Sequence, residues 1–249
     1  GIPFIFAFII GIILTGLLGF VLERTFLRPM VGEPVFSVAV LTIGIDILLR
    51  VVLDNWIGIN PKYMGDPFPS YGNFGSLDIG GLTVKYLEVT ALITSLILIF
   101  ILSVFFKRSK YGVAMRATSL DQEAALAQGI NVGRVFGLVW FIAGLLAAFA
   151  GFFITGGFNT LTNTSFISAL RALPAVVIGG LDSITGAIIG SLIIGLTQAY
   201  VGYYQFDIES AYNIKLGNGF SIVAPYLIMF VILLVKPHGL FGTEEVERV

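Results

Sequence analysis

Residues 107–134 read KRSKYGVAMRATSLDQEAALAQGINVGR, a polar stretch between two long apolar runs of the chain. A stretch of this kind is expected to lie at a membrane surface. Its middle carries the signals of a short helix, with Ser119 as the N-cap and Gln122 three residues later completing a capping box. Asp121 and Glu123 fall in the first turn, where the helix dipole favours negative charge.

Gly129 ends this predicted helix, because glycine readily adopts the left-handed conformation that closes a helix C-terminus. The helix therefore covers Leu120–Gln128, about 13 Å at 1.5 Å per residue. So short a helix is unstable alone in water, and the rest of the fold must hold it in place. A polar helix presented at a membrane surface is most simply a docking element. The alternative is an amphipathic segment that only anchors the loop.

The composition of the chain is that of an integral membrane protein. Of its 249 residues, 57% are hydrophobic and only 12% are charged, and the mean hydropathy is +0.96. A soluble domain carries roughly 25% charged residues. The net charge of −1 argues against a nucleic-acid partner, because phosphates require a basic surplus. The absence of cysteine excludes disulfides and thiolate chemistry.

The apolar runs predict an all-α, polytopic transmembrane helix bundle in a single domain covering residues 1–249. A membrane span needs about 20 apolar residues. The candidates are 2–22, 35–53, 86–106, 135–155, 166–181, 184–203 and 219–235. The run 166–181 is short and contains Pro174, so it is either a span or a half-helix, and the chain holds six or seven spans. Because the sequence starts abruptly in an apolar run at Gly1, we expect the native N-terminus to be missing.

The charges of the loops predict the orientation of the bundle. Basic residues outnumber acidic ones in the loop 107–134, and the loop 23–34 carries two arginines. The loop 54–85 contains more acidic than basic residues. The positive-inside bias places the first two loops in the cytoplasm and residues 54–85 outside. If 166–181 and 184–203 are both spans, or both half-helices, parity then places the C-terminus in the cytoplasm.

Charged residues inside the predicted spans are candidates for a translocation pathway. Asp46 and Arg50 are four residues apart on one helix face, and each costs about 2.5–3.5 kcal/mol at mid-membrane. We expect them to neutralise each other and to face the bundle or a wet cavity, either as a structural pair or as pathway-lining residues. Arg171 lies near an interface, pairs with Asp182, or borders the pathway.

The glycines of GGLDSITGAIIGSLIIG, residues 179–195, are the other candidates for that pathway. Small residues allow helix backbones to approach closely in lipid, which favours a close helix crossing. A second interpretation is a hinge or gate formed by Gly179, Gly180 and Gly186. The two interpretations are compatible.

Signatures of an enzyme are missing from the sequence. No GxxxxGK[ST] phosphate loop occurs, so the chain does not bind ATP by that route. No cluster of residues has the spacing of metal ligands, and no catalytic set can be assembled around the single His238, which we expect to lie in a turn. The chain is therefore predicted to have no ATP site, catalytic residue or metal site of its own.

Four motifs of the chain, taken together, carry a resemblance to a known protein family. The segment Glu123-Ala124-Ala125 followed by Gly129 is similar to the EAA coupling loop of bacterial ABC-importer permeases. It lies within MRAxxxDxEAAxxxGIN at 115–131. The other stretches are ERxxxRP at 23–29, VIGGLDSITGAIIG at 177–190, and KPxGLFGxxEVERV from 236. In combination these motifs resemble the permease subunits of branched-chain amino acid ABC transporters, and the resemblance extends from about residue 22 to the end of the chain.

The resemblance implies partners and roles. The predicted coupling residues are Ser119, Asp121, Glu123, Ala124, Ala125 and Gly129. They would engage a separate cytoplasmic ATPase, which would hold the ATP and Mg²⁺ that this chain does not bind. A second permease subunit, giving a heterodimer, and an external substrate-binding protein are also implied, in the lipid of a bacterial inner membrane.

Alternatives to this function are an ABC permease for sugars, urea or short amides, and an ion-coupled secondary transporter in which Asp46 is the only acid at mid-span. A non-transporting membrane scaffold is a third possibility.

Overall fold

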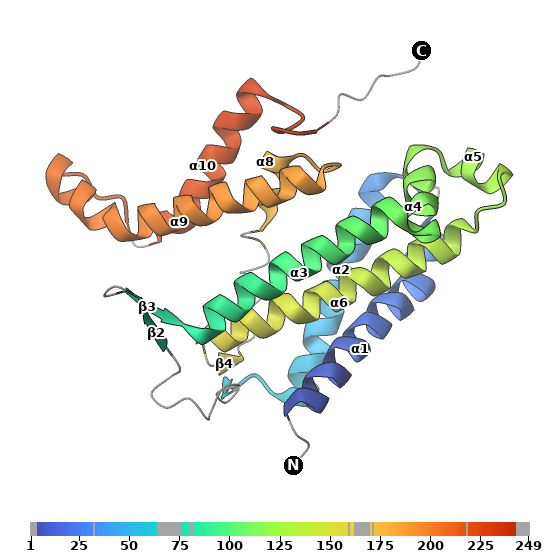
Figure 1. The fold of residues 1–249 in the computed structure, drawn as a ribbon, viewed down its shortest axis with the longest axis horizontal. Coiled ribbons are helices and arrows are strands. Elements are labelled where there is room, and N and C mark those ends of the chain that lie inside the picture. Colours follow the sequence, from blue (N-terminus) through green and yellow to red (C-terminus); the bar gives the residue numbers. More distant parts are fainter. Residues whose placement is uncertain are drawn as a thin grey trace. The chain divides into compact units, whose positions relative to one another are not determined.

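The computed structural model describes residues 4–31, 33–63, 76–79, 82–158, 160–161, 170, 172–217 and 219–242. The chain divides into two compact units, residues 1–165 and 166–249. Helices account for nearly all of the regular structure in both units (Figure 1). This confirms the predicted all-α membrane fold.

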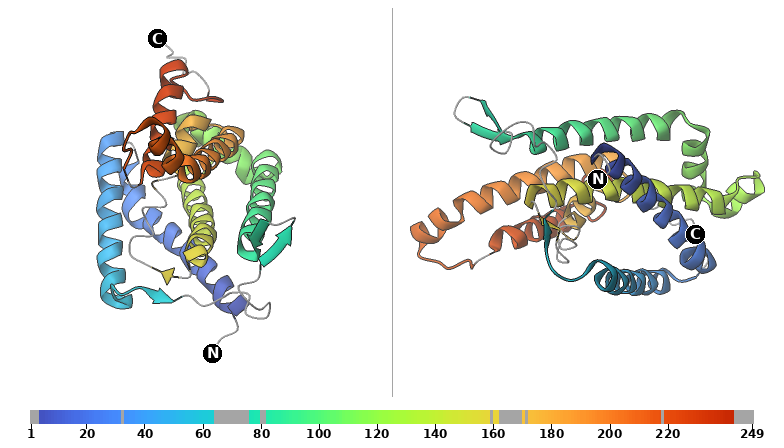
Figure 2. Two further views of the ribbon diagram at one scale, coloured as in Figure 1. Left: turned by 90° about the vertical axis from the view of Figure 1, so that its left-hand side faces the viewer. Right: turned by 90° about the horizontal axis from the view of Figure 1, so that it is seen from below.

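The first unit contains four long apolar helices. These are α1 (Phe4–Leu22), α2 (Val35–Ile57), α3 (Tyr86–Arg108) and α6 (Val132–Phe158). A π-helical turn, η1 (Glu23–Leu27), and a 3₁₀ turn, η2 (Arg28–Met30), connect α1 to α2. Two short helices, α4 (Lys110–Leu120) and α5 (Gln122–Ala127), connect α3 to α6. α2 and α3 lie on opposite sides of the α1–α6 pair (Figure 2).

Two small antiparallel ribbons complete the first unit. β1 (Lys62–Tyr63) pairs with β4 (Thr160–Leu161), and β2 (Ser76–Ile79) pairs with β3 (Leu82–Lys85). They lie at the end of the unit opposite to α4 and α5 (Figure 1). The predicted outer loop 54–85 therefore contains strands in the part that the structure describes.

The second unit contains α8 (Leu173–Gly179), α9 (Ile184–Tyr212) and α10 (Phe220–Val235). Within the described residues of the chain, five helices are long and apolar enough to cross a membrane: α1, α2, α3, α6 and α9. The apolar α10 has 16 residues, about 24 Å at 1.5 Å per residue. It is the candidate for a sixth span.

Of the run 166–181 the structure describes only residue 170 and residues 172–181, so the choice between a span and a half-helix stays a prediction. The described helix of this run, α8, has 7 residues, which is far too short to cross a bilayer. Pro174 lies in the first turn of α8, where its missing N–H removes no hydrogen bond. The proline therefore starts a helix here and does not kink one.

Glycines bring α1 and α6 into close contact. A Cβ at Gly144 of α6 would lie 2.5 Å from the carbonyl oxygen of Thr15, and one at Gly19 of α1 would collide with the carbonyl of Trp140. Only residues without a side chain permit this backbone approach. Helix packing in lipid depends on such approaches, because lipid tails provide no hydrophobic drive for association.

Close backbone contacts at glycines also join α8 to α9, which confirms the close crossing predicted for residues 179–195. A Cβ at Gly179 would collide with the backbone of Gly186, and a Cβ at Gly190 would collide with the carbonyl of Ala175. Ala175, Ile178 and Ile194 form the buried cluster of this unit. The proposed gating role of Gly179, Gly180 and Gly186 stays a prediction.

The motif KPxGLFG, from Lys236, closes the end of α8. The N–H groups of Leu240 and Phe241 donate to the carbonyls of Ile178 and Gly179, at 2.8 and 3.1 Å. These carbonyls lie in the last turn of α8, where no intrahelical donor reaches them. The tail therefore supplies the hydrogen bonds that a short helix leaves unsatisfied.

The α1–α6 contact predicts unequal effects for two glycines of α6. Gly144→Ala should reduce stability by about 1–3 kcal/mol, because the added methyl forces the backbones apart. Gly151→Ala is the matched control, since nothing lies within 4 Å of its added Cβ. Thermal unfolding of the purified proteins in detergent measures both. Equal melting temperatures for the two variants would contradict the close contact.

Candidate functional site

The loop between α3 and α6 is the first part of the candidate site. α3 ends at Arg108, and the chain turns at Ser109, whose hydroxyl oxygen accepts a hydrogen bond from the N–H of Gly112 at 2.8 Å. A Cβ at Gly112 would lie 2.6 Å from the carbonyl oxygen of Phe105. α4 therefore folds back tightly against the end of α3. It buries Gly112, Met115 and Thr118 on one face.

α5 is a separate six-residue helix with a defined cap at each end. Asp121 is extended, and its carboxylate accepts a hydrogen bond from the N–H of Ala124 at 2.9 Å. At the other end, Gly129 has φ of +81°. Its N–H donates to the carbonyl of Leu126, and the N–H of Ile130 donates to that of Ala125. This pair of hydrogen bonds is a Schellman motif, and it confirms Gly129 as the helix stop.

Two sequence-based predictions for this loop are wrong. Ser119 is not the N-cap: it lies in the last turn of α4, and its hydroxyl donates to the carbonyl of Arg116 at 2.9 Å. The predicted helix Leu120–Gln128 is therefore shorter and begins after Asp121. Serine and aspartate are comparable N-caps. Burial of Met115 and Thr118 favours Asp121 as the cap, because the packing of these two residues extends α4 as far as Leu120 and so includes Ser119 in that helix.

The coupling residues predicted from sequence lie together, but they do not all face outward. Glu123 and Ala124 are exposed, whereas Ala125 is only 3% exposed and packs within its own chain. Ala125 therefore supports α5 and is not part of its outer surface. Sequence reasoning missed Leu120 and Leu126, which are 88% and 57% exposed.

We call the exposed set around α5 the α5 surface; its members are Leu120, Glu123, Ala124, Leu126 and Ala127. It combines apolar and small side chains with the carboxylate of Glu123, and the exposed Asp121 that caps α5 lies beside it. Two leucines exposed on a polar loop are the signal that could have identified this surface from the sequence.

A partly buried ion pair fixes the base of this loop. Glu23 is 1% exposed, and the guanidinium of Arg28 meets its carboxylate with two hydrogen bonds, of 3.2 and 3.0 Å. The same guanidinium donates to the carbonyl of Gly133, in the first turn of α6, at 2.7 Å. This arrangement accounts for the ERxxxRP motif. The end of α1 is thereby joined to the start of α6, directly after residues 107–134, the predicted coupling loop.

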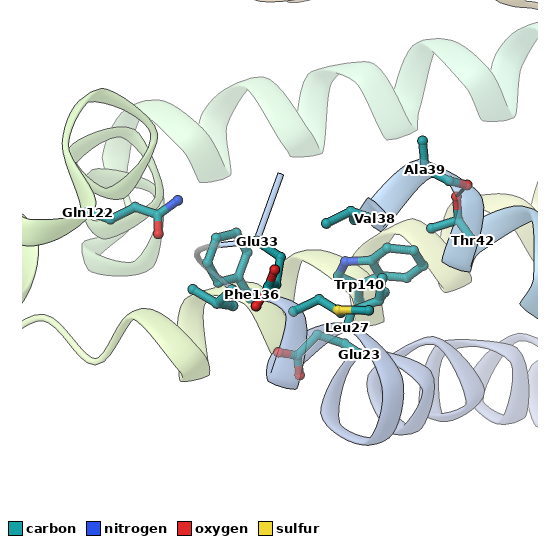
Figure 3. Close-up of a pocket in the computed structure, with 11 residues that line it drawn as sticks. Glu23, Leu27, Glu33, Val38, Ala39, Thr42, Gln122, Phe136 and Trp140 are labelled. Carbon is teal, nitrogen blue, oxygen red and sulfur yellow. Dashed lines mark hydrogen bonds between the residues drawn. The ribbon is translucent and has the colours of Figure 1, made fainter. Parts of the chain in front are cut away.

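A cavity of about 450 Å³ lies beside this pair. α2 contributes Val38, Ala39 and Thr42, and α6 contributes Phe136 and Trp140. The remaining lining residues are Glu23, Leu27, Met30, Val31, Glu33 and Gln122. Figure 3 shows that Gln122 reaches the cavity from the coupling loop. The cavity is mainly apolar with a few polar groups, which is typical of sites for small ligands.

Asp46 and Arg50 form the ion pair expected on α2. The guanidinium donates to both carboxylate oxygens, at 2.8 and 2.9 Å. Asp46 is four residues after Thr42, so the pair lies on the helix face that lines the cavity, beginning about 6 Å further along the axis. No part of the apolar window of α2 is buried within the described structure. Arg171 lies outside the described residues.

Comparison with known proteins identifies a transport family. The family described as "Branched-chain amino acid transport system / permease component" matches residues 1–235. The branched-chain amino acid permease BraD of Pseudomonas aeruginosa is 28% identical over 98% of this chain and 76% of its own length. LivH of Salmonella typhimurium is 30% identical over 97% of this chain and 75% of its own length. The ribose import permease RbsC of Bacillus subtilis is 31% identical, but over only 68% of this chain and 52% of its own length. No solved structure matches.

The two candidate caps of α5 predict different effects on its stability. Asp121→Ala should destabilise α5 by about 1 kcal/mol, because the N–H of Ala124 loses its acceptor. The amide of Ala124 should then exchange with deuterium about fivefold faster. Ser119→Ala is the control, and it should change this rate little. Faster exchange in Ser119→Ala than in Asp121→Ala would contradict the observed cap.

Proposed function

The chain belongs to the permease components of branched-chain amino acid transport systems, and from this membership we propose that it is the membrane subunit of an ATP-driven importer. Its substrates are branched-chain or related amino acids, and its location is the bacterial inner membrane. One observation supports the ATP-driven mechanism above others: α5 is capped at both ends, fixed at its base, and exposed along its outer surface.

The α5 surface is the docking element for a separate cytoplasmic ATPase. Leu120 and Leu126 provide apolar contact area, and Ala124 and Ala127 allow a partner to approach closely. The exposed carboxylate of Glu123 suits a basic or N–H-bearing group on the partner. ATP and Mg²⁺ are then held by the ATPase, since this chain has no phosphate-binding loop of the GxxxxGK[ST] type.

The contacts around α5 suit it to act as a lever. The Schellman motif joins its C-terminus to α6 within a few residues. The Arg28 guanidinium then ties α6 to the end of α1. When nucleotide binding closes the ATPases, displacement of α5 is passed to the α1–α6 pair as a rigid-body movement. Such a movement would switch the transporter between outward and inward access.

The polar face of α2 is the part of the pathway that accepts the amino acid. The charges of Asp46 and Arg50 cancel, so the pair requires no counter-ion when no substrate is bound. An amino acid zwitterion can replace the single Asp46–Arg50 ion pair by two new ion pairs. Its ammonium group then binds Asp46 and its carboxylate binds Arg50. The apolar cavity around Thr42 and Trp140, one helical turn away, suits the aliphatic side chain.

The remaining parts of the importer follow from the family. A second permease subunit completes the membrane pathway, and an external binding protein delivers the substrate. The loops 23–34 and 107–134, which carry arginines and lysines, face the cytoplasm. The C-terminus faces the cytoplasm too if the segments 166–181 and 184–203 are both spans or both half-helices. Gly179, Gly180 and Gly186 are candidates for a hinge, because their tight packing permits two discrete arrangements more readily than gradual deformation. Sugar import is the second candidate function, and the partial similarity to RbsC favours it.

Replacement of coupling residues should separate ATP hydrolysis from uptake. Glu123→Arg with Gly129→Trp reverses a charge and places a bulky residue where φ is +81°. Uptake of radiolabelled leucine by proteoliposomes containing the assembled transporter should fall at least tenfold. Lys110→Glu with Val113→Trp is the matched control on the exposed side of α4, and it should transport normally.

Two outcomes of that experiment would contradict the mechanism. Normal uptake by Glu123→Arg with Gly129→Trp would remove α5 from coupling. Uptake by the unmodified transporter that survives ATP depletion and collapses with the proton gradient would indicate an ion-coupled transporter. Transport of ribose in preference to leucine would support the second candidate function.

Neutralisation of the α2 pair should impair transport, although it removes charge from the membrane. Asp46→Asn with Arg50→Gln leaves no charges to bind a zwitterion, so the number of leucine molecules imported per ATP hydrolysed should fall about tenfold. Leu48→Ala with Val52→Ala has the same spacing on the other side of α2, where both residues are about half exposed. It should keep the wild-type ratio. An unchanged ratio in the neutral variant would show that the pair is only structural.

A further inference from the structure

A second cavity of the first unit, of about 420 Å³, is lined by three arginines, two of which, Arg24 and Arg134, have no role in the proposed transport mechanism. It lies between the end of α1 with its η1 and η2 turns and the beginning of α6. Its lining residues are Phe20, Arg24, Arg28, Asn131, Arg134, Leu138 and Phe141. No acidic side chain is among them.

The lining residues are sorted by polarity along the two helices. On the α1 side, Phe20 is followed by Arg24 and Arg28 at intervals of four residues. On the α6 side, Arg134 lies near the start of the helix, and Leu138 and Phe141 follow one and two turns later. Both sides therefore run from basic to apolar in the direction that leads from the coupling loop into the membrane. The cavity has a charged end and a hydrocarbon end.

The charged end of the cavity contains arginines that are available to bind an anion. Among the residues that the structure describes, Arg24 and Arg134 take part in no salt bridge, whereas Arg28 is engaged by Glu23. The first turn of α6 lies at the same end, with Asn131 accepting a hydrogen bond from the N–H of Arg134. A helix N-terminus adds a partial positive charge to that of the arginines. Both features favour an anion.

We propose that this cavity binds the headgroup of an anionic phospholipid. The phosphate lies between Arg24 and Arg134, and the acyl chain follows Phe20, Leu138 and Phe141 into the bilayer. Basic pockets between transmembrane helices are suited to anionic headgroups. A free phosphate ion would use the arginines but would leave the apolar end without an occupant, so the lipid accounts for both ends of the cavity.

The position of the cavity gives the bound lipid a consequence for the loop. Arg28 lines the cavity and its guanidinium also holds Glu23 and the Gly133 carbonyl. A phosphate at Arg24 and Arg134 would therefore brace the junction from which the coupling loop extends. The lipid site is independent of the substrate and does not rest on the proposed transport function.

Native mass spectrometry of the purified full chain, released from nanodiscs, tests the proposal. With equal amounts of phosphatidylglycerol and phosphatidylcholine, we expect at least a tenfold preference for retained phosphatidylglycerol. Arg24→Gln with Arg134→Gln should abolish this preference. Lys107→Gln with Lys110→Gln removes two exposed lysines elsewhere on the same loop region, and it should retain the preference.

Two further measurements distinguish a bound lipid from a free anion, and the first uses a variant that keeps all the arginines. Leu138→Gln keeps all the arginines but makes the hydrocarbon end polar, so it should weaken retention of phosphatidylglycerol severalfold. Inorganic phosphate at millimolar concentration should not displace the lipid. Equal retention of both lipids by the wild-type chain would overturn the proposal. So would an unchanged preference in the double arginine variant, or displacement by phosphate alone, which would indicate a free anion site.

Discussion

The arrangement of the first unit depends on the guanidinium of Arg28. Glu23 is an almost fully buried carboxylate at the end of a membrane helix, and a buried charge is tolerated only when it is paired and hydrogen-bonded. Arg28 supplies that pairing and also binds the carbonyl of Gly133, 105 residues away along the chain. Glu23 lines one cavity and Arg28 lines the other. The coupling loop, the apolar cavity of α2 and the arginine cavity are therefore all arranged around a single junction.

Glycine contacts stiffen a helix pair in each of the two units. Gly19 and Gly144 place the backbones of α1 and α6 against each other, and Gly179, Gly186 and Gly190 do the same for α8 and α9. Where two backbones are in direct contact, no side chain can change its rotamer to absorb the displacement of a helix. A pair of helices joined in this way moves as a body. That property suits a membrane subunit that receives its movement from outside the bilayer.

Much of the fold could be predicted from the sequence, because its signals are local. Apolar runs located the membrane helices, and the glycine pattern predicted the α8–α9 contact. Ser119 and Asp121 show where local reasoning fails: both are good caps, and burial of Met115 and Thr118 makes the choice. The role of Arg28 could not be predicted, because its partner at Gly133 is distant in sequence. Leu120 and Leu126 were missed because leucine usually indicates burial.

The central claim is that the coupling loop and the α1–α6 pair move as one body. The chain contains no cysteine, so single cysteines for spin labels can be introduced at Gln128, which caps the end of α5 and lies outside the α5 surface, and at Leu14 on α1, both exposed. Pulsed electron spin resonance on the assembled transporter then measures their separation with and without ATP. A rigid junction predicts one narrow distance distribution that nucleotide does not change. A distance that shifts or broadens when ATP binds would show that α5 moves independently of the bundle.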